Sequence, residues 1–236
     1  MLIRSIACIG SAIVVTSVSM SGQLADSVQS KGVVSKAVSA IGGPAGTERV
    51  HTLLIEATRT SVGGSDATKI VYRLMFPDRF QEVSSMTYTI DAERYWQLPV
   101  TTAENMASAR KAKTRVFTEI ALSLLVKAPG LVSVRAEPGA AASNLVFNWD
   151  NRSMRMAFDP ATGRPGGFAF EGTLVRDGVS QTVTRSVTLT DYRNVDGLML
   201  PFRWEEHIGA SAAETVISRY LVNAGVSKAD FAQPSR

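Results

Sequence analysis

The sequence predicts a mainly β protein in which two helices cover one large antiparallel sheet. Apolar residues recur at every second position in many stretches after Val50, short turn signals separate these stretches, and two further segments have helical periodicity. Strands that follow one another through short turns pair antiparallel, whereas parallel units need a crossover helix between strands. The 236 residues show no internal repeat and no low-complexity linker, so we expect one domain.

The first 25 residues have the pattern of a secretory signal peptide. Arg4 supplies one positive charge, residues 5–18 are uncharged and mostly apolar, and small residues follow as far as Ala25. This apolar run is shorter than the ~20 residues of a membrane span, and an uncleaved anchor is the alternative. We therefore predict a signal peptide over residues 1–25 and a mature domain over 26–236. The single cysteine, Cys8, lies within the predicted signal peptide.

The mature chain is predicted to begin with a helix over residues 24–41, which Gly42-Gly43-Pro44 ends. A second helix is predicted from Thr101 or Thr102 to Pro129, with an apolar stripe that includes Phe117 and Leu124. Five alternating segments predict strands with one apolar and one polar face: residues 70–76, 86–90, 145–149, 152–158 and 198–204.

The apolar face of the predicted sheet is rich in aromatic and methionine side chains. A curved sheet with such a face either packs into a solid core or encloses an apolar cavity, and the sequence leaves both open. In the cavity interpretation, the lining residues come from the strands and from the second helix. They are Tyr72, Leu74, Phe76, Tyr88, Trp96, Phe117, Leu124, Phe147, Met154, Met156, Phe170, Phe202 and Trp204.

Motifs for catalysis, cofactors and metals are largely missing. The chain has two histidines, His51 and His207, and neither lies near a second histidine or a cysteine. It contains no Gly-x-Ser-x-Gly nucleophile motif and no glycine-rich dinucleotide motif. Its net charge of +4 is spread among interleaved acids and bases, which argues against nucleic acid as a partner. We therefore expect a binding protein without cofactor or metal, and not an enzyme.

The order of several short motifs resembles the LolA-like superfamily, the periplasmic carriers of outer-membrane lipoproteins and their relatives. These motifs span nearly all of the mature chain. They are Ile41-Gly42-Gly43, Phe76-Pro77-Asp78-Arg79-Phe80, Asp91 to Pro99, Phe158-Asp159-Pro160, Asp191 to Pro201 and Asp230 to Pro234.

The resemblance implies an unclosed antiparallel β-barrel of roughly eleven strands, with helices covering the open side. It further implies a periplasmic carrier that holds lipid or lipoprotein acyl chains, contacts a membrane-associated protein partner and acts as a monomer. The alternative is a non-enzymatic periplasmic sensor or protein-interaction module on the same fold. Phe76 replaces the arginine by which the carriers latch their helical lid, and Asp91-Ala92 replaces an Asp-Gly turn. The segment from Asp191 to Pro201 is closer to uncharacterised relatives than to the carriers.

Overall fold

One antiparallel sheet forms the body of the protein. The computed structural model describes residues 20–64, 66–91, 94–99, 133–137, 143–149, 152–176 and 179–233. Within them twelve strands form a single sheet in the order β5-β4-β3-β2-β1-β12-β11-β10-β9-β8-β7-β6. The strands are β1 (Thr52–Ser61), β2 (Ala67–Met75), β3 (Arg79–Val83), β4 (Thr87–Asp91), β5 (Arg94–Leu98), β6 (Ser133–Ala136), β7 (Asn144–Trp149), β8 (Arg152–Phe158), β9 (Pro165–Arg176), β10 (Val179–Val195), β11 (Leu198–Ile208) and β12 (Ser211–Val222).

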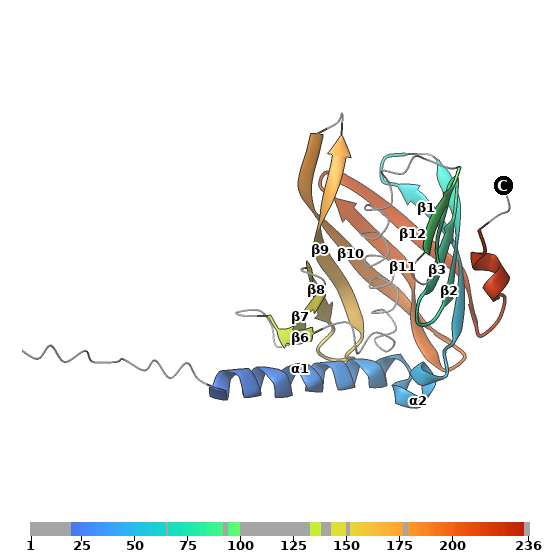
Figure 1. The fold of residues 1–236 in the computed structure, drawn as a ribbon. Helices are drawn as coiled ribbons and strands as arrows, with labels where there is room; N and C mark the ends of the chain where they lie inside the picture. The colour runs from blue at the N-terminus through green and yellow to red at the C-terminus, as the bar shows by residue number, and fades with distance from the viewer. Residues whose placement is uncertain are drawn as a thin grey trace, which may run out of the picture.

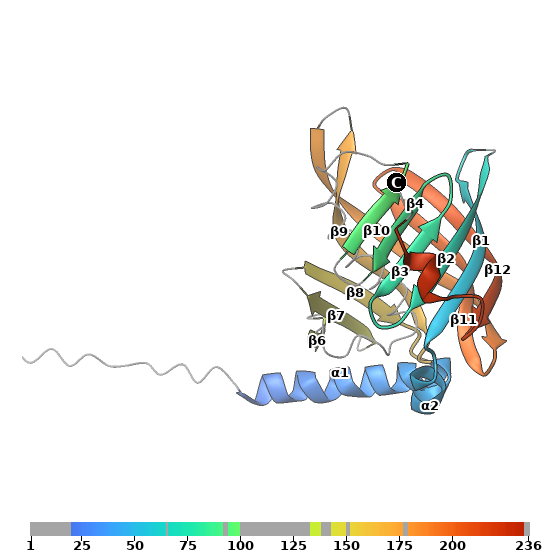
Figure 2. The ribbon, with the colours of Figure 1, turned by 45° about the vertical axis from the view of Figure 1, so that its right-hand side comes forward.

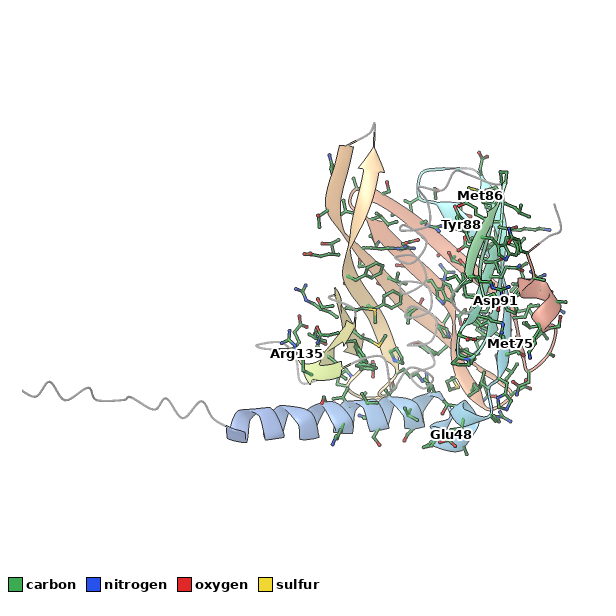
Figure 3. The ribbon with its side chains drawn as sticks, viewed as in Figure 1. Glu48, Met75, Met86, Tyr88, Asp91 and Arg135 are labelled. Carbon is green, nitrogen blue, oxygen red and sulfur yellow. The ribbon has the colours of Figure 1, made fainter. Side chains whose placement is uncertain are left out.

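The sheet curls into an unclosed barrel, which confirms the predicted fold class. In two views β2–β4 and β8–β10 lie on opposite sides of the molecule, joined through β1, β12 and β11 (Figures 1 and 2). The edge strands β5 and β6 are neighbours of one strand each, so the sheet does not close on itself. Arg135 on β6 and Tyr88 on β4 mark the two flanks (Figure 3).

Two helices lie across one end of the barrel (Figure 1). α1 (Met20–Ile41) begins four residues earlier than predicted and therefore crosses the predicted boundary of the signal peptide, but it ends where Gly42 and Gly43 take positive φ values of 138° and 74°. α2 (Gly43–Glu48) follows at once. The Lys36 ammonium in α1 donates a hydrogen bond of 2.5 Å to the carbonyl of Pro160, in the turn between β8 and β9. None of the helices in the described part of the chain is both long and apolar enough to cross a membrane.

Two apolar clusters fill the side of the sheet that faces the interior of the curl, which we call the inner face. The first cluster joins β1–β4, β11 and β12 and includes Ile55, Tyr72, Leu74, Phe80 and Phe202. The second joins β7–β10 to Val33, Val34 and Ala37 of α1 and includes Phe147, Met154, Met156 and Phe168. Trp204 on β11 packs against both clusters, so the inner face is apolar from one flank of the sheet to the other.

The predicted strands are all present, because alternation is a strong signal where one face is buried. Residues 70–75 fall in β2 and 87–90 in β4, so these two predicted strands each extend one residue beyond the observed one. Residues 145–149 fall in β7, 152–158 in β8 and 198–204 in β11. Residues 1–19 of the signal peptide predicted over residues 1–25, and the helix predicted between Thr101 and Pro129, lie outside the described residues.

Candidate functional site

Aromatic side chains form a continuous group on the first half of the inner face. The ring of Tyr72 lies 5.8 Å from that of Trp204 and 6.2 Å from that of Phe80, measured between centroids. Phe202 packs edge-on against Tyr220 at 5.1 Å. Such tilted and edge-on pairs are the favoured arrangements of aromatic rings. Tyr220 donates a hydrogen bond of 2.5 Å to the carbonyl of Pro201, and burial raises the pKa of its hydroxyl well above the usual value, so it stays neutral.

Methionine and phenylalanine side chains dominate the second half of the inner face, on β7–β9. Met154 pairs across the sheet with Phe147 and Phe170, and Met156 pairs with Leu145 and Phe168. The rings of Phe168 and Phe170 stack with centroids 6.5 Å apart. Met side chains are flexible and polarisable, so a face built from them adapts to ligands of different shape.

Most of the strand residues predicted to line a cavity lie together in these clusters. Tyr72, Leu74, Phe147, Met154, Met156 and Phe202 are buried, and Phe76, Phe170 and Trp204 pack against them while partly exposed. Tyr88 lies two residues before Ile90 on β4, so its side chain lies on the inner face with that of Ile90. Its hydroxyl lies 3.3 Å from the sulfur of Met86, at the end of the barrel away from α1 (Figure 3).

Trp96 lies on the opposite face from the one predicted. It pairs with Thr89, whereas Gln97 pairs with Tyr88, and side chains directly across two strands share a face. The indole N–H of Trp96 donates a hydrogen bond of 3.2 Å to the carbonyl of Phe231 in the short helix η1 (Lys228–Phe231). Gln81 donates from the same outer face to the carbonyl of Asp230 at 2.6 Å. Trp96 therefore anchors the C-terminal segment outside the barrel. The predicted cavity residues Phe117 and Leu124 lie outside the described residues.

An ionic triad on the inner face was not predicted from the sequence. The Glu206 carboxylate forms salt bridges with the guanidinium groups of both Arg59 and Arg185. Glu206 and Arg185 are each only 7% exposed. Arg185 also lies over the ring of Phe170, with its central carbon 5.9 Å from the ring centroid. The sequence did contain a signal for the triad. Arg185 and Glu206 are charged residues at positions where the two-residue alternation expects an apolar side chain, two residues before Val187 and two residues after Trp204.

The strand register explains how residues from three strands meet in the triad. Arg185 and Glu206 lie on the neighbouring strands β10 and β11, where Val187 pairs with Glu206. Arg59 comes from β1 and reaches Glu206 across the intervening strand β12. The residue of β12 directly opposite Glu206 is Ala213, whose small side chain leaves room for this reach.

The inner face therefore changes in character along the barrel axis. Near α1 it carries aliphatic residues, with Leu198 close to the backbone between α1 and α2. The triad lies at the other end, since Arg59 and Glu206 each precede the last residue of their strands by two positions. No group of three or more histidine, cysteine, aspartate or glutamate residues in the described ranges is arranged to hold a metal ion.

Comparison with solved structures identifies this architecture. Three solved structures superimpose on 86% of the chain and are covered over 96–97% of their own length. A LolA superfamily protein from Nitrosomonas europaea gives a TM-score of 0.52 at 9% identity, and a DUF1329 family protein from Desulfovibrio piger gives 0.52 at 10% identity. An outer-membrane lipoprotein-sorting protein domain from Vibrio parahaemolyticus, described as putative in its name, gives 0.53 at 9% identity. The chain has a LolA-like fold. No family profile and no curated protein matches the sequence.

Within the LolA-like fold, the described chain keeps the unclosed sheet and the helix across one end. Identities of 9–10% establish the fold alone, so the chemistry of the site has to be argued from the residues of the inner face.

Proposed function

We propose that this chain is a non-catalytic periplasmic protein that binds the acyl chains of lipids or lipoproteins on the inner face of its LolA-like sheet. The observation that carries the proposal is the continuity of the apolar inner face, whose two clusters meet at Trp204. Each methylene group transferred from water to such a face contributes ~0.8 kcal/mol, so about ten methylenes gain ~8 kcal/mol before the entropic cost of binding.

Three further observations support this assignment. The sheet is unclosed, so its inner face is not sealed by strand pairing between β5 and β6. Methionine and phenylalanine on β8 and β9 form an adaptable surface suited to flexible chains. The N-terminal charge followed by an apolar run supports export to the periplasm, and one of the similar structures is named a lipoprotein-sorting protein domain.

Native mass spectrometry of the mature protein, purified from the periplasm of a bacterial host, tests the proposal. We expect adducts with masses of lipids, which are released by collisional activation and recovered in an organic extract. A protein of bare mass that also takes up no added palmitate would refute lipid binding. That result would favour the alternative, a sensor or protein-interaction module with a solid core.

A further inference from the structure

The outer face of β2–β4, which points away from the interior of the curl, contains buried polar side chains. Gln81 on β3 is 6% exposed, and Thr89 on β4 is fully buried. The amide nitrogen of Gln81 donates a hydrogen bond of 3.1 Å to the hydroxyl of Thr89, and its oxygen accepts one of 2.7 Å from Arg73. The second face of an antiparallel sheet is open to water unless another segment covers it, so a covering segment buries these side chains.

The covering segment is the C-terminal end of the chain, whose helix η1 lies against β3 and β4 (Figure 2). The ring of Phe231 is 1% exposed. Gln81 and Trp96 donate hydrogen bonds to two consecutive carbonyls, those of Asp230 and Phe231. The guanidinium group of Arg73 faces the carboxylate of Asp230. Hydrogen bonds to the main chain give affinity and pockets for single side chains give specificity in peptide recognition, and the outer face offers both.

The salt bridge between Arg73 and Asp230 is not closed. Arg73 Nε lies 3.7 Å from Asp230 Oδ1, which is beyond hydrogen-bond range, and this buried nitrogen has no hydrogen-bond partner among the described residues. The other carboxylate oxygen of Asp230 accepts hydrogen bonds from the N–H and the hydroxyl of Ser227 at 2.7 and 3.0 Å, which hold the carboxylate within η1. The C-terminal segment therefore leaves one buried donor of the outer face unsatisfied.

The C-terminal segment can leave the outer face while the sheet stays folded. It follows the last strand, β12, and among residues 223–233, all of which are described, Phe231 is the one that is buried. Asn223 fixes the start of the segment, because its side-chain oxygen accepts hydrogen bonds from the N–H groups of His51 and Thr52 at 2.7 and 3.2 Å. Chain ends with few buried contacts open locally at a lower free energy than the whole domain.

We propose that the outer face of β2–β5 is a recognition site for a peptide segment of a partner protein in which an acidic residue directly precedes an aromatic one. The chain's own C-terminal segment is the internal ligand of this site, which the partner displaces. Arg73 receives the carboxylate, the pocket of Phe231 takes the aromatic ring, and Gln81 and Trp96 bind the two carbonyls. A second copy of the chain brings the same segment and gains nothing over the internal ligand, whereas a partner whose carboxylate also satisfies Arg73 Nε does. The site lies on the opposite face of the sheet from the proposed acyl-chain site and does not depend on lipid binding.

Fluorescence anisotropy of a labelled peptide, added to the full mature protein, tests the proposed site. The probe is Val-Ser-Lys-Ala-Asp-Phe-Ala-Gln, which copies residues 226–233, and two control peptides replace its aspartate by asparagine or its phenylalanine by alanine. The parent protein should bind the probe weakly, because a tethered ligand competes at a high effective concentration. Phe231→Ala removes the buried anchor of the internal ligand and should raise the affinity for the probe about tenfold or more. Both control peptides should bind more weakly than the probe.

Two further variants, made in the Phe231→Ala background, test the contact with the carboxylate. Arg73→Met should lower the affinity for the probe to that of the asparagine peptide. Arg79→Met is the matched control, because Arg79 lies on the same outer face but forms its salt bridges with Asp91 at 2.6 Å and Asp78 at 3.5 Å. The control should bind the probe as tightly as the background variant does.

Four outcomes would overturn the proposal. They are no saturable binding of the probe to Phe231→Ala, equal binding of all three peptides, equal affinity of the parent and Phe231→Ala for the probe, and unchanged binding in Arg73→Met. Elution of the parent protein as a dimer that the probe dissociates would assign the site to a second copy of the chain and overturn the partner protein. If Phe231→Ala does not fold, Asp230→Ala replaces it, because it removes the salt bridge and the contact with Ser227 but keeps the buried ring. Probe binding to Asp230→Ala that is no tighter than to the parent then refutes the site.

Discussion

The junction between α1 and α2 offers a quantitative test of how the helices are fixed to the end of the barrel. Gly42 has φ +138°, and a Cβ atom there would lie 2.9 Å from the carbonyl oxygen of Gly197 and 2.9 Å from a methyl carbon of Leu198. Gly43 next to it has φ +74°, and a Cβ atom added there would meet nothing within 4 Å. Alanine at either position adopts an unfavourable backbone conformation, but only at Gly42 does it also collide with the turn between β10 and β11.

We expect Gly42→Ala to destabilise the protein by about 3 kcal/mol, of which ~1–2 kcal/mol is backbone strain and the rest steric overlap. Gly43→Ala should cost only the strain, about 1 kcal/mol. For a domain of this size the difference of ~2 kcal/mol corresponds to roughly 4–8 °C in Tm. Urea unfolding followed by circular dichroism measures the free energy of unfolding of both variants. If Gly42→Ala is no less stable than Gly43→Ala, the contact between the helix junction and the β10–β11 turn is not as described.

The remaining predictions concern α1, the core and pH. Gly32 lies in α1 with nothing within 4 Å of an added Cβ, so Gly32→Ala should raise stability by ~0.5–1 kcal/mol in the same urea assay, and a loss would contradict the helix there. Met156 is fully buried, so Met156→Ala should cost ~2–5 kcal/mol, whereas Val216→Ala at an exposed position should change stability by under ~0.5 kcal/mol. Burial raises the pKa of Tyr192 and Tyr220 above the usual value near 10.0. The unfolded chain therefore releases these protons first, and the free energy of unfolding should fall as pH rises above ~10. Both residues should ionise only as the chain unfolds, seen as a joint change in absorbance at 295 nm and ellipticity, and ionisation of both in the folded state would contradict their burial.

The sequence was sufficient for the strands and for most of the inner face. Leu74, Met154 and Met156 alternate with polar neighbours, and a strand with one buried face leaves a single register open to such residues. The end of α1 was also predictable, because Gly42 and Gly43 can adopt positive φ values that other residues avoid. These signals come from neighbouring residues in the sequence, so they can be read without knowledge of the tertiary structure.

The sequence was insufficient where the pairing of distant strands determines which face a side chain lies on and which side chains meet. Tyr95 and Trp96 are adjacent aromatic residues, and only the pairing of Ile90 with Tyr95 determines that Trp96 faces outward. The ionic triad depends on three strands, and its acid stands in a Glu205-Glu206-His207 run that looks solvated when taken alone. The charged residues at apolar positions of β10 and β11 were the available clue. That Arg59 pairs with Glu206, however, follows only from the pairing of β1 with β12.

The inner face and the outer face each contain a tryptophan, which allows a direct test of where the ligand binds. Trp204 joins the two apolar clusters, whereas Trp96 contacts η1 on the outer face. The chain has three tryptophans in all. Replacing two of them by phenylalanine gives one variant that retains only Trp204 and a matched control that retains only Trp96, and dye displacement verifies that both still bind ligand.

Titration of these two variants with dibromostearate, whose bromine atoms quench indole fluorescence on contact, is the measurement that tests acyl-chain binding on the inner face most directly. We predict saturable quenching of Trp204 and an essentially unchanged emission from Trp96. Quenching of Trp96 with Trp204 unaffected, at ligand concentrations where binding is complete, would place the acyl chain outside the barrel and refute binding on the inner face.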